Sequence, residues 1–416
     1  MKELCFSPAD ILLPDFSKVD GTKWACIACD QFTSEEAYGV EADRLVGDAP
    51  STLRMILPEI YLGREDEGRI SAIHAAMEDY EKNILVSHPD SLMYLRRLCP
   101  TGKVREGLIG KIDLEAYDYN KGATSPVRAT EGTVISRIPP RVAVRRGAAL
   151  EAPHVMILID DPADTVFSQV RAAKNTPAYA FPLSQGGGSV TGAFVEKAAV
   201  PDILSAIAAL GEGKTDPLLF AVGDGNHSLA SAKAYYEEIK AALGAEAAKD
   251  HPARYALAEI VNIHSEALVF EPIYRVVFGA DREDLLLAMR AYAERPADGE
   301  SQTVTIVYDD NGVCKEDFTF CNGTHTLTVG TLQKFLDEYV ASHPEVEVDY
   351  IHDEESLLSL ATKPGAVGFL FAGMRKEELF SAVDRDGALP RKTFSMGVAR
   401  EKRYYLECRK ISLASL

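Results

Sequence analysis

The chain has 416 residues, of which 46% are hydrophobic and 26% are charged, a composition typical of a globular protein with two or three domains. Its net charge of −19 argues against binding to nucleic-acid phosphates, and no run approaches the roughly eighteen apolar residues of a membrane span. The first residues lack a hydrophobic signal segment and the seven cysteines are thinly spread, so we expect a cytoplasmic protein with reduced thiols.

Residues 1–150 are predicted to form an N-terminal α/β region that contributes to an active cleft. Apolar residues at helical spacing indicate a helix over 70–84, and short apolar runs indicate strands at 92–95 and 108–112. Alternation of this kind predicts an α/β or α+β fold with mixed sheets.

Cys26 and Cys29 form a lone C-x-x-C, which we interpret as buried apolar thiols rather than a redox pair or half of a zinc site. Asp30 follows directly at the end of an early predicted strand. A catalytic or metal-binding carboxylate is expected at such a position, and we take Asp30 as a candidate general base.

An all-arginine cluster stands out in this acidic chain, because arginine presents a planar fork that matches phosphate or carboxylate oxygens. An anion pocket and a solvated basic loop are equally compatible with it, and Arg128 and Arg141 are the preferred ligands for an anion. The cluster consists of Arg128, Arg137, Arg141, Arg145 and Arg146.

Residues 151–295 are predicted to form the central region. A buried strand is expected at 154–161 and another at 255–263, and the runs 178–183 and 189–195 indicate a hairpin. The three glycines between the hairpin strands are interpreted as a turn rather than as a phosphate loop, since neither a helix nor a lysine follows them.

The most informative segment of the central region is a short apolar run after Pro217 that passes through Gly223-Asp224-Gly225-Asn226-His227-Ser228 into an amphipathic helix. A strand, a small-residue loop and a helix start bring backbone N–H groups and a positive dipole end to one point, which suits a phosphate. Asp224 adds a metal ligand or an acid, and His227 adds a titratable donor. A simple helix cap is the alternative reading.

Residues 296–416 are predicted to form a C-terminal α/β region after a linker or edge loop at 295–299. The expected elements are strands near 303–308, 346–351 and 367–372, a hairpin through Asn322-Gly323, and helices near 331–341, 354–362 and 375–384.

A short segment at 389–397 carries two cations and two hydroxyls. It could close over a phosphate, with Lys392 as the ligand, or it could be a surface loop. The chain contains no Walker A motif, dinucleotide-binding fingerprint, nucleophile elbow or H-E-x-x-H, so the corresponding NTPase, dehydrogenase, hydrolase and zinc-protease classes lose their main support.

The order of several motifs resembles a bacterial and archaeal family known as domain-of-unknown-function family 1015, over nearly the whole chain. The family's central motif is usually Asp-Gly-His-His-Arg and is similar to the phosphate-binding segment of the ParB/sulfiredoxin superfamily. The resemblance therefore implies a ParB/sulfiredoxin-like core that binds a nucleotide or phosphate. The matching segments are 107–114, Arg145-Arg146, 223–228, 261–263 and 390–393.

The resemblance implies that Asp224 and His227 occupy the family's Asp and second His. Asn226 replaces the first His and Ser228 replaces the Arg, which removes an imidazole and a cation. Either the arginine cluster substitutes for them, or the phosphoryl donor is different, or this branch has lost transfer activity.

Kinases of the superfamily phosphorylate free L-serine, so the resemblance implies a phosphotransferase that uses ADP, ATP or pyrophosphate with Mg²⁺, and L-serine as the favoured acceptor. The loop residues Gly223, Gly225, Asn226 and Ser228 would hold phosphate, and Asp224 would hold the metal ion. A phosphatase and a non-catalytic nucleotide- or phosphometabolite-binding protein are the alternatives. The expected partner is a small molecule, and a homodimer stays open.

Overall fold

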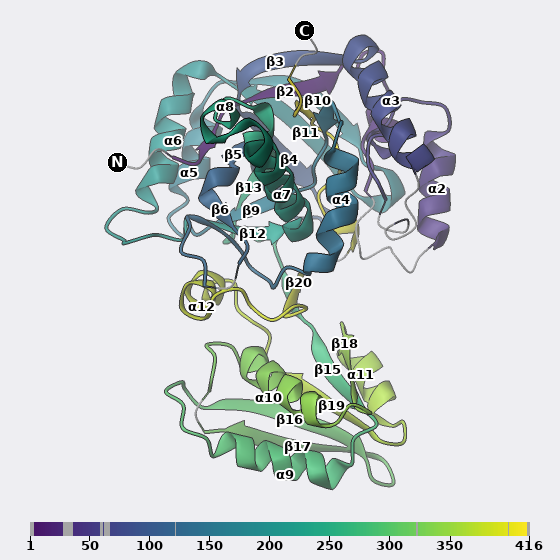
Figure 1. Cartoon of the computed structure of the whole chain (residues 1–416), viewed down its shortest axis with the longest axis vertical. Helices are drawn as coiled ribbons and strands as arrows, with labels where there is room; N and C mark the ends of the chain where they lie inside the picture. The colour runs from purple at the N-terminus through teal and green to yellow at the C-terminus, as the bar shows by residue number, and fades with distance from the viewer. Residues whose placement is uncertain are drawn as a thin grey trace. The chain divides into compact units, whose positions relative to one another are not determined.

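The computed structural model describes residues 4–27, 36–58, 61, 67–120, 122–321, 323–397 and 399–413. The chain divides into two compact units (Figure 1). The predicted boundaries at 150 and 295 do not coincide with these units, because each unit combines segments that are far apart in the sequence. Unit 1 comprises Met1–Ala129, Thr133–Leu268 and Val398–Leu416, and unit 2 comprises Thr130–Gly132 and Val269–Gly397.

A ten-stranded mixed sheet organises unit 1, and it confirms the predicted mixed α/β class. The strand order is β10-β11-β4-β5-β13-β9-β12-β7-β6, and β1 pairs with β5 beyond the end of β4. The strands of the sheet are β1 (Phe6–Ser7), β4 (Met93–Leu98), β5 (Val104–Asp113), β6 (Tyr117–Asp118), β7 (Val127–Ala129), β9 (Met156–Ile159), β10 (Asn175–Pro182), β11 (Ser189–Val195), β12 (Phe220–Asp224) and β13 (Tyr255–Asn262).

Two small strand pairs complete the β-structure of unit 1, and helices surround the sheet (Figure 1). None of the described helices is both long enough and apolar enough to cross a bilayer. The paired strands are β2 (Ala9–Pro14) with β3 (Leu85–Ser91) and β8 (Leu150–Glu151) with β21 (Arg409–Lys410). The helices are α1 (Gly21–Trp24), α2 (Glu36–Val46), α3 (Glu67–Asn83), α4 (Ile138–Arg145), α5 (Thr165–Ala172), α6 (Val200–Ala209), α7 (Asn226–Leu243) and α8 (Ala245–Ala248).

The sheet of unit 1 is buried on both faces, because successive side chains of its strands enter different cores. In β4, Tyr94 joins a cluster with residues of α5, α6 and α7, whereas Met93 and Leu95 join a cluster with residues of α1 and α3. Strands covered on both faces read as continuous apolar runs, which is why β9 and β13 were predictable. The second core is completed by the segment 404–411, which contributes Tyr404, Leu406, Cys408 and Ile411.

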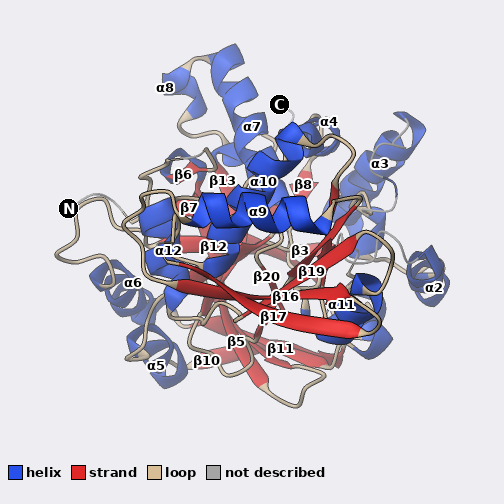
Figure 2. Cartoon of the chain, turned by 90° about the horizontal axis from the view of Figure 1, so that it is seen from below, coloured by secondary structure: helices blue, strands red, loops and turns tan. Residues whose placement is uncertain are grey.

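Unit 2 contains a five-stranded antiparallel sheet in the order β17-β16-β19-β15-β18. Figure 2 shows α9 and α10 lying side by side across this sheet. Val276 of β15 packs with α11 residues, while the neighbouring Arg275 reaches Gln333 of α10. The elements of unit 2 are β14 (Phe270–Pro272), β15 (Tyr274–Phe278), α9 (Arg282–Ala293), β16 (Gln302–Asp309), β17 (Val313–Phe320), α10 (Thr328–Ser342), β18 (Glu347–Ile351), α11 (Glu354–Ala361), β19 (Ala366–Phe371), α12 (Glu378–Asp386) and β20 (Phe394–Met396).

One expectation for this part of the chain is corrected, and another is narrowed to one of its two alternatives. The hairpin joins β16 to β17 through 310–312 rather than through Asn322-Gly323, and Asn311 and Gly312 adopt positive φ there. The segment 295–299 is a loop inside unit 2, in line with the predicted edge loop and not with the alternative of a linker between domains. β17 escaped prediction because most of its residues are exposed at the sheet edge, so it lacks a regular apolar alternation.

Candidate functional site

The predicted strand, loop and helix around residue 224 are present. β12 ends at Asp224 and α7 begins at Asn226. The pairing of β12 with β9 is irregular between Val222 and Asp224, where Gly223 lies. Gly225 occupies the helix-capping position with φ 81°, a left-handed conformation that favours glycine. Because glycine has no side chain, the first amides of α7 lack the usual side-chain acceptor, and the positive end of the helix dipole lies beside them.

Asp224 is close to a cation that the sequence did not single out. Its Oδ1 accepts a hydrogen bond from the Gly225 amide at 3.0 Å and lies 3.5 Å from Nζ of Lys402. The two side chains are only 16% and 11% exposed, so this ion pair is screened less than a surface pair. Among the described residues, no hydrogen-bond partner reaches the buried Oδ2 of Asp224 or the buried Oδ1 of Asn226.

His227 is held by the loop that precedes α4. Its Nε2 accepts a hydrogen bond from the backbone N–H of Val134 at 3.2 Å, and its carbonyl accepts one from Ser231 Oγ at 2.6 Å. A neutral imidazole that accepts at Nε2 carries its hydrogen on Nδ1, so Nδ1 is the donor in this arrangement. Next to Val134, Thr133 has a buried Oγ1 that no partner reaches within the described ranges.

Ser228 and Arg141, both predicted phosphate ligands, line one small cavity of about 110 Å³. Ser231 and His154 also line it, and the His154 ring packs edge-on against Tyr405 with centroids 4.8 Å apart. The guanidinium of Arg141 donates to the Arg137 carbonyl at 2.7 Å. The turn therefore has a cavity on the side of α4 and α7, and polar side chains form part of its lining.

The other members of the arginine cluster have structural contacts. Arg128 is buried and donates from Nε to the Ser125 carbonyl at 2.8 Å and from Nη2 to the Asp216 carbonyl at 2.9 Å. Arg145 pairs with buried Glu151 at 2.7 Å. Burial by itself would raise the pKa of Glu151, but Arg409 and then Arg145 outweigh it and lower the pKa.

One predicted ligand, Lys392, lies outside unit 1, and the position of Asp30 is not described. Lys392 belongs to unit 2, where its side chain is exposed and φ is 60°. Asp30 and Cys29 lie outside the described residues. Cys26 is buried as predicted, and burial raises the pKa of its thiol to about 12.

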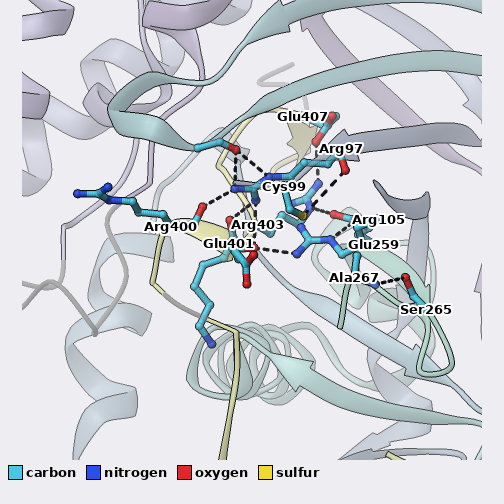
Figure 3. A network of polar contacts seen from close by, with 12 residues as sticks. Arg97, Cys99, Arg105, Glu259, Ser265, Ala267, Arg400, Glu401, Arg403 and Glu407 are labelled. Carbon is cyan, nitrogen blue, oxygen red and sulfur yellow. Dashed lines mark hydrogen bonds and ion pairs between the residues drawn. The ribbon is translucent and has the colours of Figure 1, made fainter. Parts of the chain in front are cut away.

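The segment that carries Lys402 is held by two arginines of the sheet, Arg97 and Arg105, which reach its neighbour Glu401 (Figure 3). Arg97 of β4 donates to the carbonyls of Gly187, Arg400, Glu401 and Lys402, and Arg105 of β5 donates to the Glu401 carbonyl at 2.7 Å. Burial, and then the nearby charge of Arg105, lowers the pKa of Arg97 to about 10. The carbonyls of residues 400 to 402 on one guanidinium fix the path of the chain up to Lys402.

The next residue, Arg403, connects the same segment to two buried carboxylates (Figure 3). Its Nε lies 2.8 Å from Glu259 Oε2 and its Nη2 lies 2.7 Å from Glu407 Oε2, while Nη1 donates to the Pro153 carbonyl. Tyr179 donates to Glu407 at 2.5 Å. Burial raises the pKa of Glu407 despite the attraction of Arg403. Side chains of several strands therefore hold the segment 400–407 in place.

Sequence reasoning missed Lys402 and Val134 as neighbours of the site. Nothing in the local pattern of Glu401-Lys402-Arg403 distinguishes this lysine from a surface cation. One signal in the sequence pointed to such a residue. Ser228 replaces the arginine of the family motif, so a cation from another segment was to be expected near the turn.

The turn offers few ligands to a metal ion. Among the described residues, no group of three His, Cys, Asp or Glu side chains is arranged to hold one. Asp224 Oδ2 and Asn226 Oδ1 supply two oxygens without hydrogen-bond partners in the described chain. Two such oxygens fit Mg²⁺ in its common binding mode, in which phosphate oxygens and waters complete the octahedron.

Solved structures with related folds include a point variant of a free serine kinase in complex with ADP, at 15% identity, 76% coverage of this chain, 95% coverage of that chain and a TM-score of 0.39. A conserved hypothetical protein from Pyrococcus furiosus matches at 14% identity, 73% and 94% coverage and a TM-score of 0.35. C-terminally truncated SbnI from Staphylococcus aureus matches at 13% identity, 70% and 83% coverage and a TM-score of 0.34. Similarities this low carry no argument about activity.

No curated protein sequence matches the chain. The family comparison gives a definite result, and it agrees with the resemblance drawn from the motifs. Residues 14–344, which are most of the chain, match the family described as "Protein of unknown function (DUF1015)", and the chain therefore belongs to that family.

Proposed function

We propose that this protein is a phosphotransferase that moves a phosphoryl group between ADP, ATP or pyrophosphate and a small hydroxylated metabolite, with L-serine as the favoured acceptor. The observation that carries the proposal is the uncapped start of α7 beside the buried Asp224–Lys402 pair. Phosphoryl transfer needs charge neutralisation and positioning more than covalent chemistry, and this turn supplies both.

The phosphates of the donor nucleotide would lie at the turn 223–228. Backbone amides of Asn226 and Ser228 would bind phosphate oxygens, with the helix dipole adding a favourable field, while the Gly225 amide donates to Asp224 Oδ1. Lys402 Nζ, 3.5 Å from Asp224 Oδ1, is a cation beside the turn and would offset the phosphate charge in place of the arginine of the family motif. His227 would donate from Nδ1 to a phosphate oxygen.

The acceptor would occupy the cavity of about 110 Å³ behind Ser228. This volume suits a small metabolite but not a nucleotide. Arg141 on its wall would pair with a carboxylate of the acceptor, while Ser228 and Ser231 would contact its polar groups. Arg128, although predicted to bind phosphate, donates to the Ser125 and Asp216 carbonyls and would support the sheet instead.

In the transfer step, the acceptor hydroxyl oxygen bonds to the terminal phosphorus as the bond to the leaving phosphate oxygen breaks. The hydroxyl proton passes to a general base, for which Asp30 is the candidate. Mg²⁺, held by Asp224 Oδ2 and Asn226 Oδ1 together with phosphate oxygens, would neutralise charge on the phosphates. Asp224 and Lys402 would fix the position of the phosphates throughout.

Phosphorus NMR on the full chain with L-serine, Mg²⁺ and each donor in turn tests the proposal. We expect phosphoserine from at least one donor, and at least about a tenfold loss of turnover in Lys402→Met and in Asp224→Asn. Lys249→Met, which removes an exposed lysine of the same unit, is the matched control and should keep full turnover. Unchanged turnover in Asp224→Asn would remove the turn from the mechanism, and phosphate release without serine would indicate a phosphatase.

A nucleotide- or phosphometabolite-binding protein without transfer activity is the second candidate. The hydrogen bond from Val134 N–H to His227 Nε2 favours it, because that nitrogen is then unavailable as a proton acceptor. Isothermal titration with ADP and with pyrophosphate distinguishes the two candidates. Tight binding that depends on Lys402, with no phosphoserine from any donor, would establish the binding protein.

A further inference from the structure

Unit 2 contains a fully buried arginine whose hydrogen bonds are incomplete. Arg275 of β15 is 0% exposed, and its Nε donates to Gln333 Oε1 at 2.6 Å. Its Nη1 donates to the Ile273 carbonyl at 2.6 Å and to the Lys392 carbonyl at 3.1 Å. Its Nη2 is buried and has no hydrogen-bond partner among the described residues. A buried donor without a partner is destabilising, so this one requires an explanation.

The positive charge of Arg275 is also poorly compensated. All of its hydrogen-bond acceptors are neutral, and no carboxylate of the described chain lies within ion-pair distance. Glu131 and Asp337 are the acidic groups that influence it from farther away, and Asp337 is itself bonded to Gln333 Nε2 at 2.8 Å. Burial lowers the pKa of Arg275 to about 10, in the direction expected for a desolvated cation.

A second cation lies at the same place, and a third follows it in the chain. The guanidinium carbons of Arg275 and Arg391 lie 4.5 Å and 5.4 Å from the centroid of the Tyr350 ring, and Lys392 follows Arg391 in the chain. The side chains of Arg391 and Lys392 are exposed, and neither forms an ion pair within the described residues. The charge of Arg391 repels that of Arg275 and lowers the pKa of Arg275 further, and a bound anion would relieve this repulsion.

We propose that Arg275 Nη2, Arg391 and Lys392 form an oxyanion site on unit 2 that binds the phosphate group of a phosphorylated metabolite or nucleotide, with Tyr350 as its floor. A purely structural role for Arg275 explains its bonds to Gln333 and to the carbonyl of Lys392. It explains neither the unused Nη2 donor nor the two unpaired cations beside it. An oxyanion satisfies all three, since guanidinium and ammonium groups bind phosphate oxygens through charge-assisted hydrogen bonds. The proposal does not depend on the function assigned to the turn of unit 1.

Isothermal titration of the full chain with inorganic phosphate and with pyrophosphate tests this site. All measurements are made in the Lys402→Met background, which weakens the turn of unit 1. We expect Arg391→Gln/Lys392→Gln to lower the affinity by about tenfold or more, because two charge-assisted contacts are lost. Lys363→Gln removes an exposed lysine elsewhere in unit 2 and should leave the affinity unchanged.

The test uses the exposed residues Arg391 and Lys392 rather than Arg275. Arg275→Lys keeps the charge but removes the fork of donors, and it could also impair folding. Malonate separates two sources of the oxyanion: tighter binding of phosphate assigns a phosphate group, and tighter binding of malonate assigns a carboxylate instead. Equal affinities in Arg391→Gln/Lys392→Gln and Lys363→Gln, or no heat of binding with any of the three anions, would overturn the proposal.

Discussion

Arg97 and Arg403 in unit 1 and Arg275 in unit 2 are all buried, but their surroundings differ in kind. In unit 1, Arg97 donates to four backbone carbonyls and Arg403 bridges two carboxylates and one carbonyl. In unit 2, Arg275 bonds only to neutral acceptors and leaves Nη2 without one in the described chain. An arginine whose donors are all used fixes the path of the chain, whereas one with a spare donor and an uncompensated charge is prepared for an external anion.

The largest expected effect comes from breaking the saturated network. Arg403→Met leaves Glu407 buried without its cation and leaves Glu259 with only the more distant Arg105, at 4.0 Å, so we expect a loss of about 3–5 kcal/mol in the free energy of unfolding. Urea denaturation monitored by circular dichroism measures it. Arg146→Gln, which breaks an exposed pair with Glu238, is the control and should cost less than about 1 kcal/mol. Similar losses in both variants would show that burial adds nothing to this network.

Arg275→Met should cost less, about 1–3 kcal/mol, because it leaves carbonyls and Gln333 unsatisfied but no buried carboxylate. The same denaturation experiment, repeated with saturating inorganic phosphate, sharpens the comparison. Phosphate should stabilise the wild-type chain more than the variant, since only the wild type keeps Nη2. A loss as large as that of Arg403→Met, together with equal stabilisation by phosphate, would place Arg275 among the structural arginines.

Arg97→Lys keeps the charge but replaces a fork with a point donor, so several of the carbonyls around Lys402 lose their partner. We expect about 1–2 kcal/mol of destabilisation and a weaker affinity for pyrophosphate at the turn of unit 1. Calorimetry at a temperature well below the unfolding midpoint separates the two effects. Destabilisation without any change in affinity would mean that Arg97 does not position Lys402.

The smallest effect is a change in how stability depends on pH. Burial raises the pKa of Glu407 above its ordinary value of 4.5, so its contribution is fully present below 4.5 and is lost as pH rises through the folded-state value. Glu407→Gln should therefore cost less stability at about pH 8 than at about pH 4. Glu151 provides the opposite case: its pKa is lowered, so Glu151→Gln should cost more at the higher pH. Parallel pH profiles for the two variants would contradict both directions.

The local parts of the candidate site could be predicted from the sequence, and the long-range parts could not. The apolar run, the glycines and the helical spacing after residue 228 are sufficient to predict β12, the turn and α7. Lys402 and Val134 reach the turn only through tertiary packing, and no local pattern encodes those contacts. Arg275 was equally invisible, because a single arginine in a strand reads as a surface residue until its burial is known.

The division into units shows the same limit. Strands and helices of unit 2 were mostly predicted near their observed bounds, since their apolar faces repeat regularly. Sequence patterns, however, do not reveal that 130–132 belongs with 269–397, or that the chain then returns to unit 1. The bridge between Glu131 and Leu389 that joins these segments depends on backbone hydrogen bonds, which carry no side-chain signature.

The late segment that completes the second core of unit 1 has a consequence for biosynthesis. Tyr404, Leu406, Cys408 and Ile411 fill a layer over α1 and α3, which a ribosome makes hundreds of residues earlier. Until translation reaches these residues, the nascent chain exposes the apolar surface of α1 and α3 that they cover, and such surfaces are recognised by holdase chaperones. A frameshift or stop codon shortly before residue 400 should therefore yield a product that proteases clear rather than a smaller working protein.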